Sequence, residues 1–220
     1  MQNPAFESLP SLSVWALALA ALATSGCPDP EGSFNDFGAR YDAINNSSDG
    51  GSGTGGAPDC AAVTAGDNDG QYLFALSAVL SPKKAFALDT SMTVTSDGAD
   101  GFLVDLNMQP LSKMDQMTPA GDPLVFTGLA VAADGTFTWD FGTVTLAGTA
   151  NPISDLDIIT TLVLTGQLCG GSDFICGDVT GTVATPIPDY DLTGSTFTMQ
   201  RYEGTKPAPV INCAKDPAKY

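Results

Sequence analysis

The chain has 220 residues, of which 8 are basic, 25 are acidic and none is histidine, and its formal net charge at pH 7 is −17. This acidic balance argues against a nucleic-acid partner, because phosphates are bound by basic patches. It also argues against contact between the protein body and anionic lipid. The lack of histidine excludes His-based catalytic triads and His-ligated zinc sites.

The first predicted element is an apolar run at residues 14–23, about half as long as a membrane-spanning helix must be. Such a run, followed by small residues, is typical of a secretory signal. The next residues, Thr24-Ser25-Gly26-Cys27, resemble the lipobox of bacterial lipoproteins. Two features depart from that pattern: Thr24 stands where an aliphatic residue is usual, and no Lys or Arg precedes the run.

The resemblance implies that residues 1–26 are a signal peptide and that Cys27 carries acyl groups on its sulfur and amine. The protein would then be exported and lipid-anchored to the cell envelope, at the outer membrane or the periplasmic face, with the membrane as its first partner. The alternative is an ordinary signal peptide cut near Ala23 or Gly26, which would leave Cys27 a free thiol.

Residues 27–59 are predicted to form an acidic, Gly/Ser-rich tether. Residues 47–56 alone contain five glycines and three serines. Chains of this composition behave as flexible coil with a root-mean-square reach of about 30 Å at this length. We therefore expect the tether to lift a folded domain clear of the lipid headgroups.

From Cys60 onward, apolar and polar residues alternate in short runs rich in Val, Thr, Phe and Ile, which is typical of half-buried strands. Residues 60–220 are therefore predicted to form one all-β domain, an antiparallel sandwich or barrel of about nine strands. The predicted strands are residues 71–80, 85–95, 102–108, 124–132, 136–141, 143–148, 158–168, 178–184 and 195–202.

Turn and bend signals separate these strands. Ala133-Asp134-Gly135-Thr136 predicts a tight hairpin, because Asp-Gly readily adopts the backbone angles that such turns need. Glycines recur in Leu164-Thr165-Gly166, Val179-Thr180-Gly181 and Leu192-Thr193-Gly194. Glycine within a strand often marks a bulge or bend, so this recurrence indicates curvature of the sheet.

Besides Cys27, the chain has four cysteines, an even number that indicates two disulfides in an exported protein. Three pairings are open. We prefer Cys169–Cys176 across a hairpin and Cys60–Cys213 between the two ends of the domain. A metal site with four thiolate ligands is disfavoured, because the spacings lack a C-x2-C pair.

One loop offers oxygen ligands for a cation. Asp67-Asn68-Asp69-Gly70 is a D-x-D-G element in which Asp67 and Asp69 could contribute to a calcium site, the one cofactor that the sequence suggests. The alternative is a plain turn before a strand, since Asp and Gly are also typical turn residues.

Phe137, Trp139 and Phe141 share one face of a predicted strand. They could form an apolar ligand-binding stripe, since barrels and sandwiches hold such ligands. The alternative is that they fill the core, as one face of a strand usually does.

The sequence contains no specific catalytic motif, and we expect a non-enzymatic binding or structural role at the cell envelope. The partner would be another envelope protein or a small apolar ligand, and a barrel with a ligand cavity, broadly similar to lipocalin-like carriers, is one form of this. The rival hypothesis is an envelope polysaccharide hydrolase that uses two carboxylates. Its candidates are Asp105, Asp140, Asp155 and Asp157.

Overall fold

The structure is a computed structural model that describes residues 60–219. The predicted signal peptide (1–26), the lipidation site Cys27 and the tether (27–59) lie outside the described residues. No helix within residues 60–219 is both long and apolar enough to cross a membrane.

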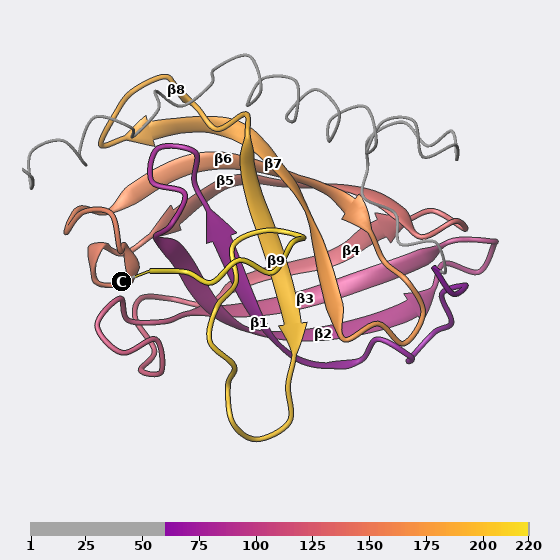
Figure 1. Ribbon diagram of the computed structural model, residues 1–220. Coiled ribbons are helices and arrows are strands. Elements are labelled where there is room, and N and C mark those ends of the chain that lie inside the picture. Colours follow the sequence, from indigo (N-terminus) through magenta and orange to yellow (C-terminus); the bar gives the residue numbers. More distant parts are fainter. Residues whose placement is uncertain (1–59, 220) are drawn as a thin grey trace, which may run out of the picture. The chain divides into compact units, whose positions relative to one another are not determined.

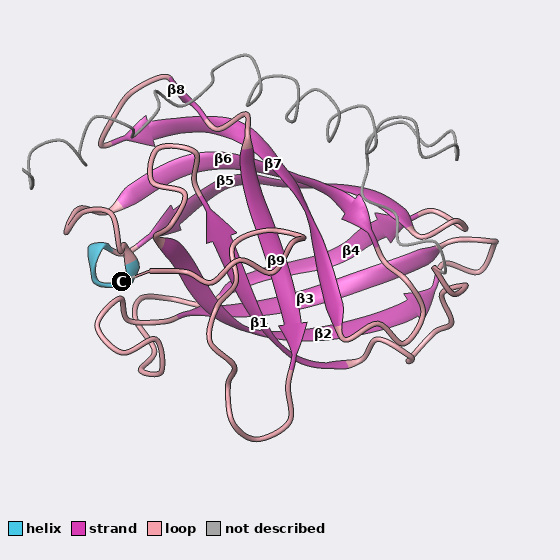
Figure 2. Ribbon diagram, in the orientation of Figure 1, coloured by secondary structure: helices cyan, strands magenta, loops and turns pink. Residues whose placement is uncertain are grey.

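The described residues are almost entirely strands, with one short 3-10 helix (Figure 2). The strands are β1 (Gly70–Ser77), β2 (Ala85–Ser96), β3 (Phe102–Pro110), β4 (Leu124–Val131), β5 (Thr136–Leu146), β6 (Ile158–Gln167), β7 (Phe174–Thr185), β8 (Tyr190–Asp191) and β9 (Ser195–Arg201). The helix, η1, spans Gly148–Ala150 between β5 and β6.

All strand pairs are antiparallel, in the order β4-β3-β2-β1-β9-β7-β6-β5, with β8 added beside β7. The sheet curls until its two edge strands, β4 and β5, approach each other, so the domain is a nearly closed barrel (Figure 1). The predicted all-β fold of about nine strands is confirmed, and it takes the barrel form.

Side chains alternate between the two faces of each strand, and the inward-facing apolar ones fill the barrel interior. In β9, Phe197 and Met199 are fully buried in the core, while Thr196 and Thr198, which alternate with them, face outward. The outward threonines also meet protein: Thr198 Oγ1 donates to Val210 O at 2.8 Å, and Thr196 Oγ1 donates to Ile211 O. A C-terminal segment, residues 207–219, therefore covers the outer face of β9 and β1.

Two matching bulges bend the edge strands. In β5 the pairing register shifts between Asp140 and Gly142, where Gly142 has a φ of 59° and donates its N–H to Asp140 Oδ1 at 2.8 Å. In β4, Gly128 has a φ of 68° and donates to Asp105 Oδ1 at 2.7 Å. Bulges increase strand bending and twist, so these sites help the sheet curl. The Gly142 bulge also explains why two predicted strands, 136–141 and 143–148, are the single strand β5.

Side chains, rather than a backbone ladder, close the gap between β4 and β5, which we call the seam. Trp139 on β5 donates its indole N–H to Ala130 O of β4 at 3.0 Å. The rings of Phe126 on β4 and Phe141 on β5 stack with centroids 4.0 Å apart. The β4–β5 connection is the predicted hairpin, with Ala132 N–H bonded to Thr136 O at 2.9 Å and Gly135 at a φ of 81°.

The preferred disulfide pairing was wrong. The disulfides are Cys60–Cys169 and Cys176–Cys213, with Cα–Cα distances of 5.0 and 5.4 Å. Side chains alternate along β7, and because Ile175 points into the core, Cys176 points out toward the C-terminal segment that carries Cys213. Cys169 lies in the loop before β7, where Gly170 N–H bonds to Ala61 O at 2.9 Å and brings Cys60 alongside.

The presence of two disulfides indicates an oxidising compartment outside the cytosol.

The Cys60–Cys169 disulfide shows at which end of the barrel the described chain begins. Cys60, where the described chain begins, lies beside the β6–β7 loop, at the end of the barrel that also carries the β2–β3 and β4–β5 connections. We call this the opposite end, and we call the end that carries the β1–β2, β3–β4, β5–β6 and β7–β8 connections the cavity end.

Candidate functional site

An apolar cavity of about 120 Å³ opens at the cavity end of the barrel. Its wall is formed by residues near the ends of β1, β2, β5, β6 and β7, by β8, and by the β1–β2, β5–β6, β7–β8 and β8–β9 connections. The lining side chains are almost all hydrocarbon: Leu76, Ala78, Leu80, Phe86, Leu146, Ile153, Ile158, Leu162, Val183, Pro186, Ile187 and Leu192, with Asn151, Ser154, Thr160 and Tyr190.

The buried polar groups in this wall are already satisfied by protein. Asn151, which is 1 % exposed, donates to Ser154 Oγ at 2.8 Å and to Leu156 O at 2.9 Å, and its carbonyl oxygen accepts from the N–H of Ile153 at 2.9 Å. Thr160 Oγ1 donates to Thr182 O at 3.0 Å. These bonds leave the cavity with little to offer a polar ligand atom, so it suits a hydrocarbon group.

The same hydrogen bonds hold the β5–β6 part of the wall in place. Asn151 folds the loop so that Ile153 lines the cavity. Asp157 Oδ1 accepts the N–H of Gly148 at 2.7 Å, which closes the loop across the start of η1. Asp155 forms an ion pair with Lys113 of the β3–β4 connection. The cavity wall is therefore fixed before any ligand arrives.

The cavity is smaller than the pockets that hold drug-sized ligands, which are about 300–1,000 Å³. An engineered apolar cavity of about 150 Å³ in another protein stays dry and binds benzene. By this comparison, a cavity of about 120 Å³ accepts one ring or the end of one alkyl chain. Leu80 and Ile187, which are 47 % and 44 % exposed, both line the cavity and reach solvent at its mouth.

The predicted aromatic stripe lies elsewhere. Phe137, Trp139 and Phe141 are all buried in the core, and none of them lines the cavity. Phe137 stacks on Trp139 with ring centroids 3.8 Å apart, and the other two reach across the seam. Their placement favours the core interpretation of the stripe.

The predicted calcium ligands lie in the turn before β1. Asp69 Oδ1 accepts the N–H of Val94 at 2.7 Å, and the Arg201 guanidinium donates to the backbone carbonyls of Asp67 and Asp69. Arg201 thus binds the carbonyl oxygens of this turn. Among residues 60–219, no three His, Cys, Asp or Glu side chains are grouped as a metal site would require.

The carboxylates of the rival hydrolase hypothesis have structural contacts. Asp105 and Asp140 hold the two bulges, Asp155 pairs with Lys113, and Asp157 binds the N–H of Gly148. Asp157 also lines a second hollow of about 420 Å³, together with Asp122, where β4 and β5 diverge at the cavity end. The walls of this hollow mix polar and apolar groups.

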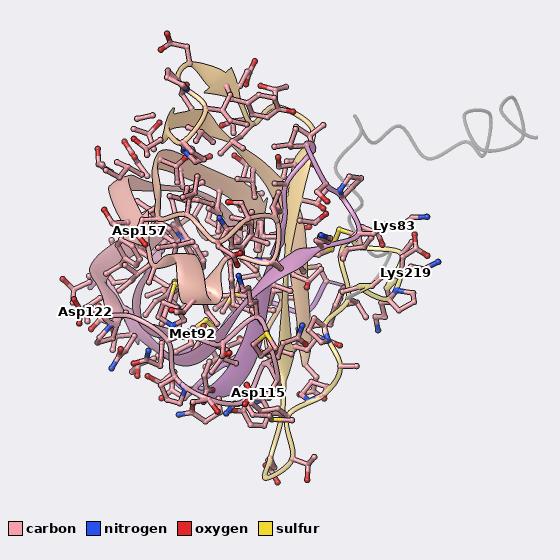
Figure 3. The ribbon with its side chains drawn as sticks, turned by 90° about the vertical axis from the view of Figure 1, so that its left-hand side faces the viewer. Lys83, Met92, Asp115, Asp122, Asp157 and Lys219 are labelled. Atoms are coloured by element: carbon pink, nitrogen blue, oxygen red, sulfur yellow. A yellow bond between two sulfur atoms is a disulfide. The ribbon has the colours of Figure 1, made fainter. Side chains whose placement is uncertain are left out.

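Charged side chains lie on both sides of the cavity end. Viewed onto this end, Lys83 and Lys219 lie on one side and Asp122 and Asp157 on the other (Figure 3).

Asp115 caps the β3–β4 loop: hydrogen bonds from the Thr118 hydroxyl and from the N–H groups of Thr118 and Met117 lower its pKa to about 2. These hydrogen bonds hold the backbone of the loop beside Asp115.

No protein-family model, curated protein or solved structure matches this chain. The site is thus defined by its own geometry. Sequence reasoning missed the cavity residues, because they come from separate stretches between Leu76 and Leu192 and no local pattern joins them. The nearest signal was the exposed apolar pair Val79-Leu80, which follows β1 where a polar turn is usual.

Proposed function

We propose that this chain is a lipid-anchored cell-envelope protein whose barrel binds a small apolar ligand, or the apolar end of a larger one. One observation carries the binding role: a preformed cavity whose buried polar groups are already paired, so that its walls present hydrocarbon. The anchor rests on the resemblance of residues 14–27 to a lipoprotein signal. The disulfides support export.

Binding is driven by transfer of hydrocarbon from water into the cavity, at about 25 cal/mol per Å² of apolar surface buried. The walls provide no charge and no free buried donor to select a head group. Selectivity is therefore by size and shape, and any polar part of the ligand stays at the mouth, beside Leu80 and Ile187.

Thermal unfolding with toluene as the probe tests this function. A ligand that binds only the folded state raises the melting temperature as its concentration rises. We expect toluene to raise the melting temperature of the wild-type chain, and Ala78→Leu to abolish the increase by filling the cavity. Val183→Phe should do the same from another wall.

The matched control is Ala133→Leu, the same substitution at an exposed site in the β4–β5 hairpin at the opposite end. This variant should keep the full response to toluene. A wild-type melting temperature that toluene does not raise, or equal increases in Ala78→Leu and Ala133→Leu, would show that the cavity does not bind apolar ligands.

The rival hydrolase function has less support, because its four candidate carboxylates are engaged in structural contacts. A retaining or inverting hydrolase needs one carboxyl with a raised pKa to act as general acid. The carboxyl pKa values that shift in the described residues, those of Asp115, Asp134 and Asp191, are all lowered by hydrogen bonds from neighbouring threonines.

A further inference from the structure

Every large apolar side chain that is exposed in residues 60–219 lies at the cavity end of the barrel. We call these side chains the apolar ring. Its members are Val79, Leu80, Met114, Met117, Val125, Leu156, Ile159 and Ile187. Soluble proteins rarely gather exposed apolar groups on one face unless that face meets a partner or a membrane.

The members of the ring are distributed over the whole cavity end. Each of the four connections that define this end contributes to it: β1–β2, β3–β4, β5–β6 and β7–β8, together with the second residues of β4 and β6. Leu80 and Ile187 belong to both the ring and the cavity wall, so the apolar surface continues from the rim into the barrel.

The opposite end of the barrel has acidic connections without exposed large apolar side chains. Its connections carry Asp97 and Asp100 in the β2–β3 loop, Asp134 in the β4–β5 hairpin and Asp173 before β7, and none of the eight exposed apolar side chains. The cavity end carries the acidic residues of its own loops but also Lys83, Lys84 and Lys113. The connections of the cavity end are therefore less acidic than those of the opposite end, and zwitterionic headgroups, which carry no net charge, do not repel them.

We propose that the apolar ring docks on the surface of a phospholipid bilayer, so that the cavity mouth opens toward the hydrocarbon. A ring of aliphatic and thioether side chains around an apolar opening suits a fluid hydrocarbon phase. The proposed lipid on Cys27 would make the bilayer the surface nearest to this ring. This inference rests on the proposed function and deepens it, because it makes the membrane the source of the ligand.

The proposed lipid anchor on Cys27 and the apolar ring can contact the same membrane at the same time. The described chain begins at Cys60, at the opposite end of the barrel, and the longest strands, of 12 residues, span about 40 Å. The 33 residues from Cys27 to Asp59 would span about 110 Å if fully extended. A lipid on Cys27 therefore leaves enough chain for the barrel to turn its cavity end to the same membrane.

Flotation with phosphatidylcholine vesicles tests the ring. We would use the full chain with Cys27→Ser, so that no acyl group provides the contact, and compare it with Met114→Ser/Leu156→Ser in the same background. These two residues are 84 % and 57 % exposed and do not line the cavity. Residues 1–59 are identical in both proteins, so a difference between the two reports on the ring.

We expect the double substitution to weaken vesicle association about tenfold, as the loss of two partly buried apolar side chains implies. Ala133→Ser at the opposite end should change nothing. Hydrogen exchange with vesicles present should slow in residues 113–117 and 155–159 and not in residues 97–101. Equal association of all variants, or equal slowing at both ends, would overturn the inference.

The toluene experiment separates this inference from the proposed function. A double variant that floats like its parent but still responds to toluene would refute membrane docking and leave ligand binding intact. If the parent chain does not float but self-associates in sedimentation, and Met114→Ser/Leu156→Ser does not self-associate, then the ring is a protein–protein contact and docking on lipid is wrong.

Discussion

Trp139 lies at the point where the two edge strands approach without a backbone ladder. Its indole N–H satisfies the carbonyl of Ala130 on β4, and its ring, which is 1 % exposed, stacks on Phe137. An unpaired backbone carbonyl at a sheet edge must otherwise bind water or remain unsatisfied. This one side chain therefore joins strands that the hydrogen-bond ladder leaves apart.

We predict that Trp139→Phe lowers the free energy of unfolding by about 2 kcal/mol, because it removes the cross-seam hydrogen bond and part of a buried ring. Chemical denaturation measures this loss. The wild-type minus variant emission spectrum should show a buried indole, with a maximum well to the blue of indole in water. A loss below about 0.5 kcal/mol, or emission typical of wet indole, would contradict this role.

Tyr202 lies between β9 and the C-terminal segment and holds this part of the chain to β2. Its hydroxyl donates to Asp89, whose other carboxylate oxygen binds Lys206 Nζ at 2.9 Å. Burial, and then the hydrogen bond to Asp89, raise the pKa of Tyr202 well above its ordinary value. The folded state thus favours the neutral phenol, so Tyr202 contributes stability below pH 10 that is lost as the pH rises beyond it.

We therefore predict that wild-type stability falls more steeply than that of Tyr202→Phe between pH 9 and 11. Near pH 7 the variant should be less stable by about 1–2 kcal/mol, since it loses a hydrogen bond to a charged acceptor. Denaturant midpoints across this pH range measure both effects. Parallel pH profiles for the two proteins would show that Tyr202 titrates with its ordinary pKa.

Among the elements, the C-terminal segment behaves as an outer layer of the barrel. Leu73, Ala75 and Ile211 are buried beneath or within it, and Gln200 Nε2 donates to Ala208 O at 3.0 Å. The Cys176–Cys213 disulfide fixes this layer to β7. The other disulfide ties the first described residue to the β6–β7 loop.

The two disulfides should differ in their contribution to stability. They close loops with sequence separations of 37 and 109 residues, which the chain-entropy model converts to about 4 and about 5 kcal/mol. We predict that Cys60→Ser/Cys169→Ser destabilises the protein by about 1 kcal/mol more than Cys176→Ser/Cys213→Ser. Guanidinium denaturation of the two double variants tests the order, and the reverse order would mean that packing of the C-terminal segment dominates.

Strand positions could be predicted from the sequence because each strand carries its own alternation of apolar and polar residues. The β1, β2, β4, β6 and β9 boundaries fall within a few residues of those expected. The start of β7 was missed, since Phe174-Ile175-Cys176-Gly177 shows no alternation of apolar and polar residues. The disulfide pairing was missed for a related reason: the outward direction of Cys176 follows from Ile175 pointing inward, once β7 is known to begin before it.

At the scale of the whole molecule, the proposed function depends on an asymmetry between the two ends of the barrel. One end carries acidic turns and the cysteine pair at the start of the domain, while the other carries the cavity and the apolar ring. No sequence pattern predicted this arrangement. Its residues are spread from Leu76 to Leu192, and only the sheet order brings them together.

The central claim is that the cavity binds hydrocarbon, and methyl NMR of the full chain titrated with toluene tests it most directly. We predict saturable shifts of the Leu76, Ile153 and Val183 methyl resonances, which line the cavity. The core methyls of Val104 and Leu106 should not shift, and Ala78→Leu should abolish the response. Cavity methyls that do not shift at saturating toluene, or that shift equally in Ala78→Leu, would contradict the account.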